Sequence, residues 1–314
     1  MNKPIFSFPL NPLAHAISVS RRRPTWKALL FGGLAGSLSL AEAFELSTLD
    51  GNNGFAIEGQ NANEQLGKSV NGAGDINGDG IDDVILYARG ADPAFGRAYI
   101  VFGRNTAASV NFTPRFDLTL LTANLTNLNT SFGFTIEGIN GDNPARSVAS
   151  AGDINGDGID DLILGSAENT LGPNNLPLMG TGKAYVIYGR NTAQAGFFPN
   201  TIDLRQLTAD QGFIISGITG GDQAGSAVDG VGDVNGDGID DLVVGARFAD
   251  AEGRLDAGES YVVFGKNAST DGAFPLNFEL SSLDGSNGFT LSGANIEDLS
   301  GHAVSGAGDI NGDG

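Results

Sequence analysis

The sequence predicts an all-β fold built from repeated units. An acidic motif recurs along the chain, with the leading aspartates Asp75, Asp153, Asp233 and Asp309 lying 78, 80 and 76 residues apart. The segments between the motifs are short, rich in β-branched and aromatic residues, and bounded by Gly, Asn, Asp or Pro, which is typical of strands. Glycine makes up 48 of 314 residues, about twice the usual share of ~7%, as expected for a chain with many turns.

The first 43 residues are set apart from this repeated region. Arg21, Arg22, Arg23 and Lys27 precede the uncharged apolar stretch 28–41, and Ala41-Glu42-Ala43 follows as a small-x-small pattern. This order predicts a signal peptide and leader over 1–43, cleaved after Ala43, and therefore an exported protein. The apolar stretch is short for a membrane span, which needs ~20 residues. An N-terminal anchor or an internal helix is the alternative interpretation.

The remaining chain divides into repeats at 44–115, 116–201, 202–277 and an incomplete 278–314. Each repeat opens on an aromatic or Ile residue, an acidic residue and Leu, as at 44–46, and continues with a Gly-Phe strand, as at 54–57. After each complete acidic motif come an apolar run, an aromatic-Gly strand such as 98–103, and a connector of 12 residues. About four strands per unit of this size predict the blades of a β-propeller. A solenoid of sheets is the competing architecture, although solenoid repeats usually span only ~20–45 residues.

The acidic motif places oxygen-bearing side chains at alternate positions of a glycine-containing turn. Such spacing lets the oxygens converge on one point, as at the start of an EF-hand loop, where carboxylates and a backbone carbonyl surround Ca²⁺. The candidate ligands, with Ile contributing its carbonyl, are Asp75, Asn77, Asp79, Ile81 and Asp83; Asp153, Asn155, Asp157, Ile159 and Asp161; Asp233, Asn235, Asp237, Ile239 and Asp241; and Asp309, Asn311 and Asp313.

Calcium is the cofactor that this donor set favours. Mg²⁺ fits less well, because it requires a small rigid octahedron and retains several waters. The competing interpretation is a turn that carries solvated charge. Three full copies weigh against it, because no turn requires five identically placed oxygens.

The charge balance limits the partners. The chain carries 37 acidic and 17 basic residues, a formal net charge of −20, with no Cys and two His. This charge disfavours nucleic acid and anionic membrane surfaces, because both are bound through Lys and Arg. The absence of Cys excludes disulfides, thiol nucleophiles and Cys-based metal sites. An apolar content of 40% argues against intrinsic disorder.

The combined pattern resembles the FG-GAP repeats of the integrin α-chain propeller. The resemblance rests on the order of Gly-Phe strand, Ser-Val segment, Gly-Asp-x-Asn-Gly-Asp-Gly-x-Asp-Asp-Leu loop and Tyr-Val-x-Phe-Gly strand, and covers 44–314. It implies a seven-bladed ring with Ca²⁺ in its acidic loops, of which about three and a half blades are present. It also implies a role in adhesion or ligand recognition. The Gly-Ala-Pro element of the family is not intact here, as at 165–167.

Two classes of function follow. The first is a secreted or cell-surface platform, not an enzyme, that recognises an extracellular protein or glycan through loops such as 167–181 and 248–257. The alternative, also implied by the resemblance, is the non-catalytic propeller portion of a larger phospholipase-like hydrolase. His302 is the sole His after residue 43, which leaves little room for a Ser-His-Asp set. Because the fourth loop stops at Gly314, we expect further blades or domains to follow.

N-glycosylation sequons form a weaker signal. They begin at Asn111, Asn124, Asn129 and Asn267. Turns rich in Asn and Thr also produce such matches by chance.

Overall fold

Strands dominate the chain, which confirms the predicted all-β class. The computed structural model describes residues 45–61, 63–90, 96–105, 111–122, 132–138, 147–167, 169–171 and 177–310. The predicted signal peptide and leader at 1–43 therefore lie outside the described residues.

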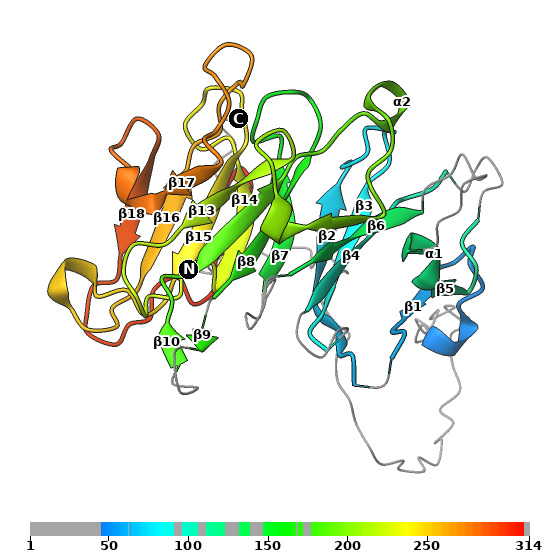
Figure 1. Cartoon of the computed structure of the whole chain (residues 1–314), viewed down its shortest axis with the longest axis horizontal. Helices are drawn as coiled ribbons and strands as arrows, with labels where there is room; N and C mark the ends of the chain where they lie inside the picture. The colour runs from blue at the N-terminus through cyan, green and yellow to red at the C-terminus, as the bar shows by residue number, and fades with distance from the viewer. Residues whose placement is uncertain are drawn as a thin grey trace, which may run out of the picture. The chain divides into compact units, whose positions relative to one another are not determined.

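The elements follow one another in a repeating order (Figure 1). The strands are β1 (Ala56–Glu58), β2 (Leu66–Gly74), β3 (Asp83–Ala88), β4 (Arg97–Val101), β5 (Arg115–Asp117), β6 (Gly133–Glu137), β7 (Ser147–Gly152), β8 (Asp161–Ser166), β9 (Asn169–Leu171), β10 (Pro177–Met179), β11 (Lys183–Ile187), β12 (Thr201–Asp203), β13 (Gly212–Ser216), β14 (Ala227–Gly232), β15 (Asp241–Ala246), β16 (Glu259–Val263), β17 (Asn277–Glu279) and β18 (Gly288–Ser292). Single helical turns lie at α1 (Thr119–Thr122), α2 (Thr192–Ala195), η1 (Leu46–Thr48), η4 (Leu204–Gln206), η5 (Ala251–Gly253) and η6 (Leu280–Ser282).

The larger sheets share one plan, which is that of a propeller blade. Four antiparallel strands form the order β2-β3-β4-β6 in the first sheet, β7-β8-β11-β13 in the second and β14-β15-β16-β18 in the third. The first two sheets gain a short fifth strand, β12 or β17, which pairs in parallel with the outermost antiparallel strand. β1 and β5 pair in the same parallel way, and β9 and β10 form a separate antiparallel pair.

The sheets are offset from the sequence repeats. The Gly-Phe strand of the second repeat, β6, completes the first sheet, and the Gly-Phe strand of the third repeat, β13, completes the second sheet. The parallel strands β12 and β17 come from one repeat further along the chain, at the start of the third and of the fourth repeat. The first two sheets therefore each contain strands from three successive repeats, and the third sheet contains strands from two, so neighbouring repeats cannot separate without breaking strand pairs.

The hydrophobic cores lie between the faces of adjacent sheets. One core packs residues of the first sheet, such as Ile85 and Phe134, against residues of the second, such as Leu162 and Ile187. A second core packs the other face of the second sheet against the third sheet. All three residues at 162–164 are at most 1% exposed. Burial on both faces explains why this strand is apolar without alternation.

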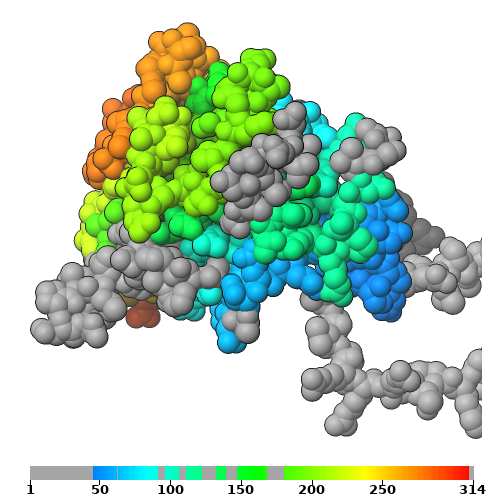
Figure 2. Space-filling view, turned by 45° about the vertical axis from the view of Figure 1, so that its right-hand side comes forward, coloured from blue at the N-terminus to red at the C-terminus, as the bar shows by residue number. Residues whose placement is uncertain are grey.

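The 12-residue connectors fasten each repeat to the Gly-Phe strand of the preceding sheet. Phe198 stacks on Phe134 with ring centroids 4.3 Å apart, and Phe274 stacks on Phe213 at 4.2 Å. Across the face shown in Figure 2, the colours run broadly in chain order, as this pairing of successive repeats requires.

Candidate functional site

Each acidic loop joins the first strand of a sheet to the second, and its first aspartate organises the turn. The Asp75 carboxylate accepts hydrogen bonds from the N–H groups of Asp79 and Gly80, at 2.9 and 2.7 Å. Asp79 in turn accepts from the N–H of Ile81 at 3.0 Å. Gly80 has a φ of +85°, a left-handed conformation that favours glycine. The motif therefore folds locally, through bonds between its own residues.

The second and third loops repeat this geometry. Gly158 donates its N–H to Asp153, and Gly238 donates to Asp233, both at 2.7 Å. Asp157 and Asp237 accept from the N–H two residues later, as Asp79 does. The predicted aspartates at the start of each loop thus accept from the same backbone N–H groups in all three loops.

The last aspartate of each loop is held at the base of the turn by a donor that sequence reasoning missed. The N–H groups of Gly103, Gly189 and Gly265 donate to Asp83, Asp161 and Asp241 at 2.7, 2.7 and 2.8 Å. These glycines end the aromatic-Gly segments. They follow the last aspartate of their loop by 20, 28 and 24 residues, and this recurrence was the available signal in the sequence.

The last aspartates are almost fully buried, at 0–1% exposure. Burial raises the pKa of Asp83 to about 7; the charges of Asp79 and Asp75 act in the same direction, against the hydrogen bond from Gly103. Burial likewise raises the pKa of Asp161 well above its usual range. A buried carboxyl with other carboxylates nearby gains from a positive counter-charge.

The buried Asn side chains of the first two loops indicate that this counter-charge is a bound cation. Asn77 and Asn155 are 2% and 4% exposed. Each donates its Nδ2 group to the last aspartate of its own loop, Asn77 at 3.2 Å from the Asp83 carboxylate. The Oδ1 atoms of both residues are buried and accept no hydrogen bond. A buried amide oxygen without a partner is costly, and a bound cation would satisfy it.

The carboxylates alone do not form a complete metal site. Within the ranges that the structure describes, no three Asp, Glu or His side chains are close enough together to hold a metal ion. The predicted donor set also includes Asn and the carbonyls of Ile81, Ile159 and Ile239, and the ligand role of these groups stays a prediction. In the fourth loop, Asn311 and Asp313 lie outside the described residues, and Asp309 is exposed.

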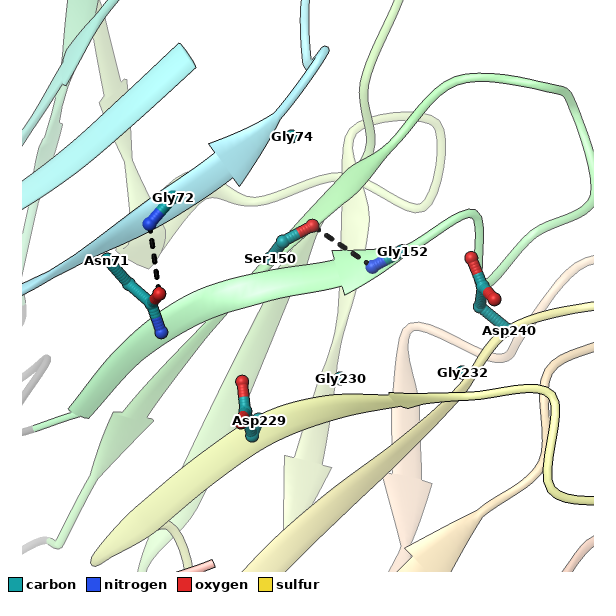
Figure 3. Close-up of a pocket in the computed structure, with 9 residues that line it drawn as sticks. All are labelled: Asn71, Gly72, Gly74, Ser150, Gly152, Asp229, Gly230, Gly232 and Asp240. Carbon is teal, nitrogen blue, oxygen red and sulfur yellow. Dashed lines mark hydrogen bonds between the residues drawn. The ribbon is translucent and has the colours of Figure 1, made fainter. Parts of the chain in front are cut away.

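A shallow groove of about 350 Å³ follows the first strands of the sheets (Figure 3). Asn71, Ser150 and Asp229 line it from three neighbouring strands, β2, β7 and β14. The Ser150 hydroxyl accepts a hydrogen bond from the N–H of Gly152, and no His or Lys is among the residues that line the groove. The groove therefore presents amide, hydroxyl and carboxylate oxygens that can form hydrogen bonds.

None of the helices in the described ranges is long and apolar enough to cross a membrane.

Comparison with known proteins agrees with the repeat pattern. The FG-GAP repeat model matches residues 145–187 and 224–263. These ranges cover the first three antiparallel strands of the second and third sheets with their acidic loops.

Two curated relatives carry the name phosphatidylinositol-glycan-specific phospholipase D. The protein of Dictyostelium discoideum is 28% identical over 207 residues, which cover 62% of this chain and 19% of the relative. The protein of Bos taurus is 28% identical over 195 residues, which cover 60% of this chain and 19% of the relative. The chain thus spans about a fifth of the length of these relatives. The matched segments and the sheets agree: the chain contains FG-GAP repeat matches over 145–187 and 224–263, and its all-β fold fits the propeller blades that such repeats form.

Proposed function

We propose that the protein is an extracellular, calcium-binding propeller platform for adhesion or for recognition of a protein or glycan ligand. The observation that carries the calcium assignment is the pair of buried amide oxygens, Asn77 Oδ1 and Asn155 Oδ1, which lack hydrogen-bond partners. Both lie in loops whose turn is closed by hydrogen bonds to the first aspartate. Hard oxygen donors of this kind are the ligands that Ca²⁺ prefers.

Residues at the same motif positions would hold the calcium ion in each complete loop. The first and second aspartates, such as Asp75 and Asp79, hold the turn in shape by accepting hydrogen bonds from backbone N–H groups. Asn77 and the buried Asp83 supply oxygen from the inner side of the loop. A bound Ca²⁺ would supply the positive charge that offsets the mutual repulsion of the carboxylates of Asp75, Asp79 and Asp83. The metal would thereby fix the connection between the first two strands of a sheet, which is a structural role.

Calcium titration tests the assignment. Extracellular calcium modules bind with Kd values of ~10⁻⁴–10⁻³ M. With a Kd of ~0.1 mM and ~1 mM Ca²⁺, each site would add about 1.4 kcal/mol to the free energy of unfolding. We expect heat on injection in calorimetry and a rise in Tm, both reduced in Asp153→Ala. Asp284→Ala is the matched control, because Asp284 caps a similar turn outside the acidic loops. Absence of both heat and a Tm rise would sink the calcium assignment.

Two features support the extracellular platform. The predicted export signal at 1–43 precedes the repeats. The segment 248–257 lies between β15 and β16 and exposes Leu255, which is 56% accessible. Loops presented by a rigid scaffold are common binding sites. Expression with the native N-terminus should yield secreted protein beginning at Phe44; retention of residues 1–43 in the secreted or surface-bound protein would contradict cleavage after Ala43.

A second candidate function is the non-catalytic propeller portion of a larger extracellular hydrolase. The two phospholipase D relatives favour it, because their similarity falls on a region that includes the repeats yet covers only 19% of each relative. This candidate predicts that the chain alone releases no protein from a glycosylphosphatidylinositol-anchored substrate. Cleavage by the isolated chain would place catalytic residues within these repeats and overturn both candidates.

A further inference from the structure

The first aspartate of the Asp-Asp pair in the motif reaches the preceding repeat. Asp160 stands beside the last candidate ligand of its own loop, yet its Oδ2 accepts a hydrogen bond from the N–H of Asp75 at 2.7 Å. Asp240 accepts from the N–H of Asp153 in the same way at 2.9 Å. The donors are the first candidate ligands of the preceding loop. These two aspartates therefore bind the neighbouring loop instead of their own.

Glycines before the donors leave room for this contact. Gly74 and Gly152 both have a φ of +64°. A Cβ at Gly74 would lie 2.3 Å from Asp160 Oδ2, and a Cβ at Gly152 would lie 2.2 Å from Asp240 Oδ2. Figure 3 shows the Asp240 carboxylate beside the end of β7 at Gly152. The close approach of the carboxylate thus requires glycine at these positions.

The following repeat also covers the backbone of each of these loops. In the first loop, the carbonyl oxygens of Ile76 and Asn77 accept from the N–H groups of Arg190 and Thr192, both at 3.0 Å. In the second loop, the N–H of Ala268 donates to the Asn155 carbonyl at 2.8 Å. The recurring Arg-Asn or Lys-Asn segments therefore dock on the preceding loop.

The third loop has the same motif, but no described residue donates a hydrogen bond to the carbonyls of Val234 and Asn235. The side chain of its Asn also lies in a different position. Asn235 is exposed, and its Oδ1 accepts from the N–H of Asp237 at 2.9 Å. Val234 is 50% exposed, whereas the equivalent Ile76 and Ile154 are fully buried. The inward position of Asn77 and Asn155 therefore accompanies docking of the next repeat.

We propose that Asp160 and Asp240 are positioning residues that latch each blade to the candidate calcium loop of the preceding blade. Docking of the following blade holds the first aspartate and the Asn of that loop in place for the cation. Calcium affinity in one blade is thereby coupled to its contact with the next. The coupling to calcium rests on the proposed function; the latch itself does not.

The test follows each loop separately in the full chain. Gly80, Gly158 and Gly238 donate to the first aspartate of their loops, so their amide resonances report the three loops in a calcium titration followed by NMR. Loss of an outer-shell partner typically lowers metal affinity 10–100-fold. We expect Asp160→Ala to raise the calcium midpoint of Gly80 at least tenfold and to leave the midpoint of Gly158 unchanged. Asp160→Asn keeps an acceptor oxygen and should retain most of the affinity.

Asp82→Ala is the matched control. Asp82 occupies the same motif position, is exposed, and accepts no hydrogen bond from the described residues. It should leave all three midpoints unchanged. A shift at Gly158 instead of Gly80 in Asp160→Ala would show that Asp160 serves its own loop, and would overturn the proposal.

Hydrogen exchange without calcium tests the latch independently. The Asp75 amide should exchange faster in Asp160→Ala than in Asp82→Ala, and equal exchange would overturn the latch. If no glycine responds to calcium in the wild-type chain, the proposed calcium function fails, and the Asp75 exchange rate still decides the latch.

Discussion

Phe198→Ala tests whether the connectors hold successive repeats together. Phe198 is 5% exposed and belongs to the core between the first two sheets. Its ring stacks on Phe134 at 4.3 Å, and the guanidinium of Arg190 lies 4.8 Å from its centroid. Truncation removes this contact and leaves a cavity between a connector and the preceding Gly-Phe strand.

The expected magnitude follows from burial. Phe→Ala at a fully buried position costs ~3–5 kcal/mol, which includes the cavity left behind. The neighbouring Phe197 is 54% exposed, so its truncation should cost about 1 kcal/mol, half of the transfer free energy of a buried Phe. We therefore expect Phe198→Ala to lower the free energy of unfolding by about 3 kcal/mol more than Phe197→Ala.

Urea unfolding followed by far-ultraviolet circular dichroism measures the difference. Both variants lose the same side chain at adjacent positions of the same connector, so the composition of the two variants is identical. A large fall in the urea midpoint is expected for Phe198→Ala and a small one for Phe197→Ala. Losses equal within about 1 kcal/mol would refute the stacking role of the connector.

Two further predictions concern a glycine of the motif and a buried acid. Gly152→Ala should lower Tm more than Gly232→Ala. The two glycines have similar φ values, +64° and +71°, but only at Gly152 would the new Cβ clash with Asp240. Equal losses of Tm would contradict this steric role. Burial raises the pKa of Asp222 to about 6. Since the folded state then binds the proton more tightly, the free energy of unfolding should fall as pH rises from about 4 to about 6. Asp222→Asn should remove about 1–2 kcal/mol of this fall in urea unfolding with a chelator present; an unchanged slope would show that Asp222 titrates normally.

The repeat pattern predicted the strands and the acidic loops well, because both are local properties. The aromatic-Gly segment at 98–103 overlaps β4, and the Gly-Phe segment at 133–136 overlaps β6. The pattern did not show that β6 completes the sheet of the preceding repeat. Strand pairing between segments more than 30 residues apart leaves no trace in the periodicity of either segment.

The hydrogen-bond partners that reach the loops from distant segments were also missed. Gly103 donates to Asp83 from 20 residues away, and Asp160 accepts from Asp75 across 85 residues. Both residues belong to recurring motifs, so their repetition was visible in the sequence. Their partners were not, since a hydrogen bond between distant segments depends on how the sheets pack.

The sequence by itself determined the conformation of the acidic loops. Asp75, Asp153 and Asp233 bind the same backbone groups four and five residues later, because aspartate and glycine at fixed spacing close the turn without help from other segments. Only the tertiary structure decided which copies are buried. Asn77 and Asn155 are buried while Asn235 is exposed, and Phe134 and Phe213 are fully buried while Phe289 is 38% exposed. The motif is the same in each case, but burial depends on the neighbouring repeat that packs over it.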